Sequence, residues 1–172
     1  MSTGQTTGQT ATGTWLTTEA HARLQHDLEQ MTGPQRAHIV SRIEAAREEG
    51  DLKENGGYHA AKDEQGKLEA RIRQLAALLR DVRVGQTPAG DLVEEGVLVT
   101  IDYGAPGDED LETFLFASRE NATDEGGKIG SLDVYSPESP IGQAILGHRA
   151  GEQVTFGPRA ITVTIKEIKP YA

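Results

Sequence analysis

Apolar side chains in the first half of the chain recur at helical spacing. The first set follows steps of three and four with one longer gap: Leu24, Leu28, Met31, Ile39, Ile43 and Ala46. Such spacing places side chains on one face of a helix. The step from Met31 to Ile39 is eight residues instead of seven, and Thr32-Gly33-Pro34 lies within it. Because proline disfavours regular helix before it, we expect a kink or short break at this point.

A second helical stripe follows a short polar stretch. Its members are separated by four, three, four and three residues: Leu68, Ile72, Leu75, Leu79 and Val82. This heptad pattern favours pairing with the first stripe as an antiparallel coiled coil. Thr17 or Thr18 is the expected N-cap of the first helix. The second helix is predicted from about Asn55 to Val84, roughly 45 Å long at about 1.5 Å per residue.

The pattern changes to a period of two after Gly85-Gln86-Thr87-Pro88-Ala89-Gly90, which has the composition of a linker. Ser139-Pro140 is typical of a helix start, and Gly147 of a helix end. One short helix is therefore expected at 141–146. The predicted strands are 97–103, 111–118, 132–135, 153–156 and 161–165.

These elements predict an α+β protein with an N-terminal helical hairpin and a C-terminal antiparallel sheet domain. The expected divisions are a disordered tail at 1–14, a hairpin at 15–85, a linker at 86–90 and the sheet domain at 91–172. The tail repeats Thr, Gly and Gln without a charged side chain, a composition that cannot bury enough surface to order itself.

The distribution of charge along the chain supports this division into two parts, and the net charge excludes some functions. Residues 15–85 hold 12 acidic and 11 basic side chains, whereas residues 86–172 hold 15 acidic and 6 basic ones. A net charge of -10 argues against unaided binding to duplex DNA. No cysteine is present, which excludes disulfides and thiolate metal sites. No apolar run reaches membrane-spanning length, so we expect a cytoplasmic protein without a membrane partner.

Candidate chemistry lies in the polar stretch Glu48–Tyr58 between the two stripes. Asp51 and Glu54 are three residues apart, a spacing that brings both carboxylates to one side of a helix start. One interpretation is a capping box, with Asp51 as N-cap and Glu54 at the third helical position. The other is a pair of hard oxygen ligands for Mg²⁺, completed by another molecule. A calcium loop is excluded because Lys62 stands where an EF-hand requires glutamate.

The same stretch carries a family resemblance. Glu44–Asn55 contains Asp-Leu-Lys-Glu-Asn, and Tyr58-His59-Ala60-Ala61-Lys62 follows. Together they resemble the hairpin tip of the bacterial Gre-type transcription elongation (transcript cleavage) factors. Ser136 to Gly147 is similar to a loop and helix in that family's C-terminal domain. The resemblance spans about Trp15 to Tyr171, although Gly56-Gly57 stands where many members have Ala-Glu.

The resemblance implies a coiled coil followed by a domain of FK506-binding-protein-like fold. It implies that this domain docks on the rim of the RNA polymerase secondary channel while the coiled coil reaches the active centre. There the tip would help the polymerase hold Mg²⁺ and hydrolyse backtracked RNA. The chain would then not be an enzyme itself, because the hydrolysis takes place at the polymerase's own site. Mg²⁺ is expected only in that complex, with no cofactor in the free protein, which is expected to be a monomer.

Residue roles follow from the same resemblance, position by position. Asp51 and Glu54 match the family's metal-holding acids. The residues expected near the 3′ end of the nascent RNA are Arg47, Lys62 and Lys53. Those expected to support the tip are Asn55 and Tyr58. Those expected at the polymerase are Glu138, Ser139 and Pro140. Simpler readings stay open: solvated helix faces for the basic residues, tip packing for Tyr58 and an ordinary helix start for Ser139-Pro140.

Two other functions are compatible with this chain. A non-catalytic regulator or inhibitor could enter the same channel with the same fold, but its tip would be expected to differ. A prolyl isomerase of FK506-binding-protein type is disfavoured because the C-terminal half has few aromatic residues to line a proline pocket.

Overall fold

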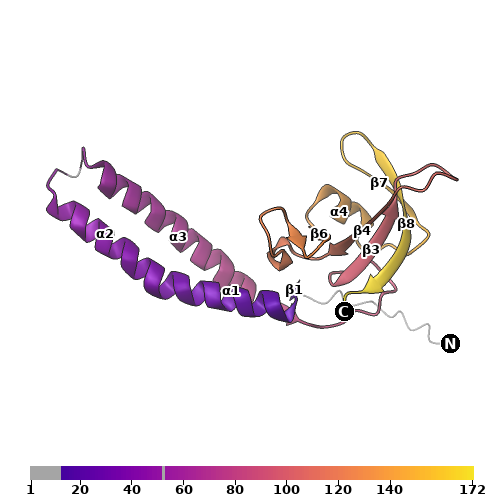
Figure 1. The fold of residues 1–172 in the computed structure, drawn as a ribbon, viewed down its shortest axis with the longest axis horizontal. Coiled ribbons are helices and arrows are strands. Elements are labelled where there is room, and N and C mark those ends of the chain that lie inside the picture. The colour runs from indigo at the N-terminus through magenta and orange to yellow at the C-terminus, as the bar shows by residue number, and fades with distance from the viewer. Residues whose placement is uncertain (1–12, 52) are drawn as a thin grey trace, which may run out of the picture.

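The computed structural model describes residues 13–51 and 53–172. Two paired helical segments extend away from a sheet domain, which lies at the other end of the molecule (Figure 1). The N-terminal elements are β1 (Thr14–Leu16), α1 (Thr18–Gln30), a π-helical turn (Met31–Gln35), α2 (Arg36–Glu48), α3 (Gly56–Arg80) and β2 (Val82–Val84).

The seam between the helices consists of two separate clusters of buried side chains. Near the sheet domain, Leu16, Ala20, Leu24 and Leu75 are buried together. Nearer the far end, Ile39, Ile43 and Ala61 form the second cluster. The expected antiparallel hairpin is therefore present, and Thr17 is the N-cap of α1, its side chain accepting from the amide of Ala20.

The irregularity at Thr32 to Pro34 is a π turn within a continuing helix and not a break. A π turn accommodates one extra residue in a helix, which matches the eight-residue step in the seam. The hydroxyl of Thr32 donates to the carbonyl of Leu28 at 2.8 Å.

The prediction that the second helix reaches Val84 is wrong. The helix ends at Arg80, and β2 then pairs in parallel with β1. Val82 still packs against the hairpin's inner cluster, so the apolar stripe continues beyond the helix. Thr14, assigned to the disordered tail, belongs to β1, and residues 1–12 of that tail lie outside the described residues.

The C-terminal half forms a sheet of six strands in the order β5-β6-β4-β3-β8-β7. Its elements are β3 (Val97–Asp102), β4 (Leu111–Phe116), a 3-10 turn η2 (Arg119–Asn121), β5 (Lys128–Ile129), β6 (Leu132–Tyr135), α4 (Pro140–Ile145), β7 (Gln153–Phe156) and β8 (Ile161–Pro170). The last strand is longer than expected because it pairs with the whole of β3 across a register shift at Thr100/Ile101.

The sheet is mixed. The expectation of a wholly antiparallel sheet is therefore wrong for one pair of neighbouring strands. β4 and β6 run in parallel. Parallel neighbours need a crossover connection, and the segment containing η2 and β5 supplies it. α4 covers one face of the sheet, where Ile141 and Ile145 join the main core with Phe114 and Phe116.

The opposite face is covered in part by the N-terminal half. Trp15 is buried against Leu115, Ala117 and Val134. No helix in the described part of the chain is both long and apolar enough to cross a membrane.

Candidate functional site

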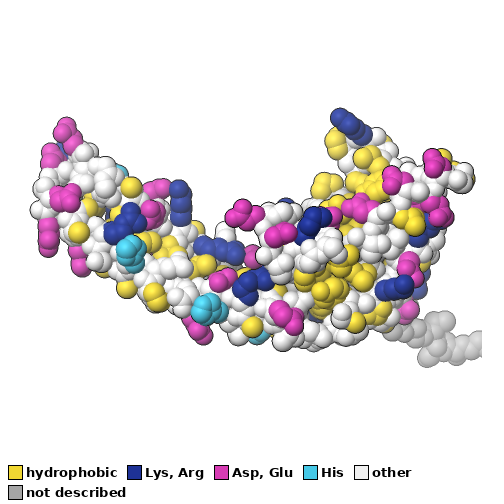
Figure 2. Space-filling view, in the orientation of Figure 1, with side chains coloured by type: hydrophobic (Ala, Val, Ile, Leu, Met, Phe, Trp, Pro, Cys, Tyr) yellow, Lys and Arg dark blue, Asp and Glu magenta, His cyan; other side chains and the backbone are white. Residues whose placement is uncertain are grey.

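The tip of the hairpin is an open turn between α2 and α3. The last residue of α2 is Glu48, and Gly50 then adopts a φ of 114°, a left-handed conformation that ends helices and favours glycine. The side chains of Glu48, Glu49, Asp51 and Glu54 are exposed. Acidic side chains accordingly gather at this end of the arm (Figure 2).

The cap of α3 is Asn55, so the interpretation of Asp51 as N-cap in a capping box is wrong. The side-chain oxygen of Asn55 accepts from the amide of Tyr58 at 3.0 Å. Its side-chain nitrogen donates to the carbonyl of Ala46 at 2.7 Å. One amide side chain therefore starts α3 and ties it to the end of α2.

The two acids are left open toward solvent. Asp51 accepts one hydrogen bond, from the amide of Lys53 at 3.0 Å, which shapes the turn locally. Within the described residues, the carboxylate of Glu54 takes part in no hydrogen bond or ion pair. Both carboxylates keep free oxygen lone pairs for an outside ligand.

Tyr58 supports the tip from inside. Its half-buried ring packs against the cluster of Ile39, Ile43 and Ala61. The guanidinium of Arg47 lies 5.9 Å from the ring centroid, within the range of a cation–π contact. The ring of His59 lies edge-to-face with the same ring, at 5.6 Å between the two centroids. Packing by Tyr58 was one of the two readings that the sequence left open.

The remaining basic residues lie on exposed surface. Lys62 donates to the side-chain oxygen of Gln65 at 3.0 Å, along α3. Lys53 is exposed, and its carbonyl oxygen is 3.3 Å from Nε2 of His59. This contact of His59 depends on how the turn folds back onto the first turn of α3, so no sequence pattern indicates it.

The residues present can supply only part of a metal site. In the part of the chain that the structure describes, no three potential ligand side chains of His, Cys, Asp or Glu come together. Two open carboxylates suit a hard cation such as Mg²⁺, which binds to few protein ligands and keeps water on the others. The donor set of the tip therefore fits a shared ion and not a site of its own.

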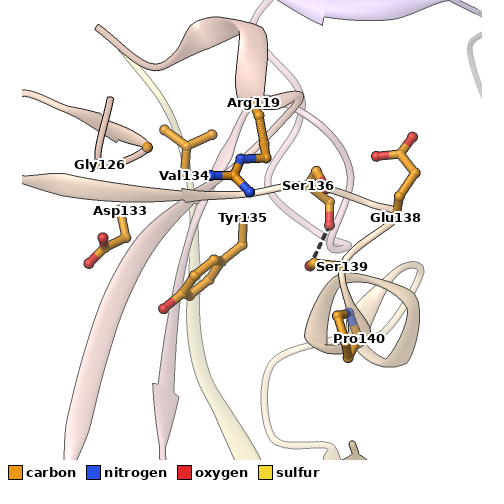
Figure 3. A pocket seen from close by; sticks show the side chains of 10 residues that line it. Arg119, Gly126, Asp133, Val134, Tyr135, Ser136, Glu138, Ser139 and Pro140 are labelled. Atoms are coloured by element: carbon orange, nitrogen blue, oxygen red, sulfur yellow. Dashed lines mark hydrogen bonds between the residues drawn. The ribbon is translucent and has the colours of Figure 1, made fainter. Parts of the chain in front are cut away.

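A second candidate surface lies at the start of α4. The hydroxyl of Ser139 accepts from the amide of Gly142 at 3.0 Å and donates to the carbonyl of Ser136 at 2.7 Å (Figure 3). A Cβ at Gly142 would lie 1.9 Å from that carbonyl oxygen, so only glycine lets the loop close onto the helix. Pro140 follows as the first residue of α4, and Glu138 is exposed.

This loop borders a cavity of about 370 Å³. Arg119, Val134, Tyr135, Glu138 and Ser139 are among its lining residues (Figure 3). Burial and a hydrogen bond to Glu112 raise the pKa of Tyr135 well above its usual range, which keeps its hydroxyl a donor. The cavity and the tip lie on different domains.

Comparison with known proteins covers both halves. Residues 14–84 match the family model described as "Transcription elongation factor, N-terminal", and residues 88–170 match "Transcription elongation factor, GreA/GreB, C-term". The transcription elongation factor GreA of Streptomyces coelicolor is 48% identical, over 92% of this chain and 94% of its own length. GreA of Saccharopolyspora erythraea is 49% identical, over 92% of this chain and 95% of its own length.

A solved structure of GreA factor homolog 1 (Gfh1) from Thermus thermophilus covers 91% of this chain and 99% of its own, with a TM-score of 0.41 at 23% identity. Membership rests on the family models and the curated relatives. The chain belongs to the GreA/GreB family of transcription elongation factors.

Proposed function

We propose that this protein inserts its hairpin into the secondary channel of RNA polymerase and stimulates hydrolysis of backtracked nascent RNA. The observation that carries the proposal is the pair of open carboxylates, Asp51 and Glu54, at the end of a long two-helix arm. Family membership supports it, since the relatives are transcription elongation factors.

The arm suits this task by its dimensions. The helical run from Thr18 to Glu48 is roughly 45 Å long at about 1.5 Å per residue. Its inner face is apolar and buried, while its far end is polar. Such an arm delivers its tip to a distant centre without needing to bind strongly along the way.

The tip residues have separate tasks in this proposal. Asp51 and Glu54 would hold Mg²⁺ together with ligands of the polymerase. A bound cation of this kind activates water and stabilises charge on the phosphate. Arg47, Lys62 and Lys53 attract RNA phosphates near the 3′ end. Asn55 and Tyr58 keep the turn in place through the cap and the ring packing described above.

The reaction itself belongs to the polymerase in this account. The protein supplies two carboxylates, and the described residues contain no larger cluster of metal ligands. It acts where RNA polymerase works, in the bacterial cytoplasm, and as a monomer. Glu138, Ser139 and Pro140 present the docking surface, next to the cavity at the start of α4.

A non-catalytic channel regulator is the alternative function with the same fold. A protein that only blocked the channel would not need open carboxylates at the far end of its arm. The tip here keeps both acids exposed and its turn tied by Asn55, which favours cleavage.

The direct test uses a halted elongation complex that has backtracked, with labelled RNA. Adding the protein with Mg²⁺ is expected to release short 3′ fragments faster than the polymerase alone. A polymerase lacking its own catalytic metal ligands should remain inactive with the protein added. Binding without faster cleavage would instead support the regulator.

A further inference from the structure

The hairpin and the sheet domain are joined by a specific interface at η2. Asn121 is fully buried, and its side chain contacts two backbone positions of the N-terminal half. Its oxygen accepts from the amide of Thr17 at 2.8 Å, and its nitrogen donates to the carbonyl of Trp15 at 3.0 Å. Because Thr17 is also the N-cap of α1, the first turn of the arm is fixed directly to the sheet domain.

Both helices of the arm are anchored to the same turn. From α1, Arg23 donates to the carbonyls of Glu120 and Ala122 at 2.6 and 3.1 Å. From α3, Arg71 forms a two-bond ion pair with the carboxylate of Glu120 at 3.1 and 3.2 Å. Paired bonds between a guanidinium and a carboxylate restrict orientation as well as distance.

A buried aromatic side chain completes the interface. Trp15 is 2% exposed and donates through its ring nitrogen to the carbonyl of Gln86 at 2.7 Å. Gly96 lies close to the ring, since a Cβ at this position would be only 2.7 Å from a ring atom. Close packing and directional hydrogen bonds at one place leave the arm little freedom to tilt.

A small tilt at this interface has a large effect at the tip. A rotation of 10° at the base would move the end of an arm of roughly 45 Å by about 8 Å. Reaction rates are sensitive to such shifts, since a misplacement of about 1 Å can cost about a hundredfold. The base of the arm therefore controls whether Asp51 and Glu54 reach a reacting centre.

We propose that Glu120, Arg71 and Asn121 are positioning residues that aim the arm, so that docking by the sheet domain brings the tip acids to the polymerase centre. The inference rests on the proposed function. It predicts that weakening the interface lowers cleavage by the bound protein without weakening docking. Arg119 of η2 lines the cavity beside the docking loop at 138–140, whereas Arg71, Glu120 and Asn121 do not line it.

The test is a charge reversal and its repair. Glu120→Arg places a cation against Arg71, and the double variant Arg71→Glu/Glu120→Arg restores an ion pair. Glu69→Arg is the matched control, because Glu69 forms a similar two-bond pair with Arg36 inside the hairpin. Side-chain exposure is also similar, at 41% and 34% for Arg36 and Glu69 against 41% and 27% for Arg71 and Glu120.

Two readouts are needed, both on the full-length chain. Cleavage in halted complexes is measured over a range of factor concentrations, which separates the rate at saturation from the half-saturating concentration. The arm angle is measured by pulsed electron paramagnetic resonance between spin labels at Ala45→Cys and Ala150→Cys. Both positions are exposed, and the chain has no native cysteine.

For Glu120→Arg we expect saturated cleavage to fall by about tenfold or more, with half-saturation changed less than about twofold. The distribution of distances between the two spin labels should become broader. The double variant should recover both readouts, and Glu69→Arg should leave both at the parental level.

Parental cleavage by Glu120→Arg would overturn the inference, as would a loss that the double variant fails to repair. An unchanged distance distribution in Glu120→Arg would also overturn it. If the parent protein itself failed to stimulate cleavage, the proposed function would fall, while the distances would still decide whether this ion pair fixes the arm.

Discussion

At the scale of single residues, the tip shows what spacing can and cannot predict. Asp51 and Asn55 both belong to residue types that cap helices, and the Asp-x-x-Glu spacing favoured Asp51. In the structure Asn55 is the cap, because its side-chain amide accepts from a backbone amide of α3 and donates to a backbone carbonyl of α2. A carboxylate cannot donate, and only the folded turn shows that the carbonyl of Ala46 lies within reach of this side chain. This choice leaves Asp51 free for another role.

The two functions of Asn55 can be separated by substitution. Asn55→Ala removes both bonds and should destabilise the first turn of α3 by about 1–2 kcal/mol. Amide hydrogens at the start of α3 should then exchange roughly tenfold faster or more. Asn55→Asp keeps the cap and loses only the bond to Ala46. Its amide exchange rate should therefore lie between those of the parent and Asn55→Ala. Equal exchange in all three proteins would contradict this assignment.

Asp102 predicts a dependence on pH in the loop between β3 and β4. Hydrogen bonds from the amides of Gly104 and Asp110 hold its pKa below the ordinary value of 3.8. For a carboxyl with a lowered pKa, the stabilisation is present above the ordinary value and is lost as pH falls through the lowered one.

The amide signals of Gly104 and Asp110 should therefore shift together, with a midpoint below 3.8, in an NMR titration. Asp102→Asn should remove that transition while keeping an acceptor for both amides. A midpoint above the ordinary value would mean that these two hydrogen bonds do not determine the pKa of Asp102.

At the scale of elements, local patterns predicted the helices and most strands, and failed where distant segments meet. The eight-residue step in the seam and Pro34 did identify the irregular turn. The end of α3 was missed because Val82 continues the apolar stripe into β2, and β2 exists by pairing with β1 about 70 residues earlier in the chain. The parallel β4–β6 pair likewise depends on a crossover that no local period encodes.

Gly66 lies within α3 at an exposed position where a Cβ would meet nothing within 4 Å. Nothing in the structure explains glycine there, and it costs a helix about 1 kcal/mol relative to alanine. Gly66→Ala should therefore raise the free energy of unfolding of the hairpin by about 0.5–1 kcal/mol. Denaturant unfolding followed by circular dichroism at a helix wavelength measures this, and a loss of stability would reveal a hidden packing role.

At the scale of the whole molecule, the sequence did not set the relation between arm and sheet domain. That relation depends on Asn121, which bonds to Trp15 and Thr17 more than 100 residues earlier in the chain, and no motif marks these residues. The linker composition at 85–90 suggested only that two parts are joined. In the structure the two parts meet at a packed interface.

Gly96 tests this interface through the single tryptophan of the chain. Its φ is 97°, and a Cβ would come within 2.7 Å of the Trp15 ring. Gly96→Ala should displace the ring, shift tryptophan fluorescence to longer wavelength and lower the melting temperature. Gly107→Ala is a suitable control, since Gly107 also has a positive φ but no atom near its Cβ position. Identical emission from Gly96→Ala and the parent would contradict the packing described.

The role of the two open acids, Asp51 and Glu54, is tested most directly by one measurement. Cleavage of backtracked RNA is compared at saturating concentrations of the parent, Asp51→Asn and Glu54→Gln, with binding to polymerase measured in parallel. Each variant keeps the shape of the side chain and removes its charge. We expect a loss of about a hundredfold or more in cleavage by each variant, with binding to polymerase unchanged. Cleavage at the parental rate by both variants would contradict it.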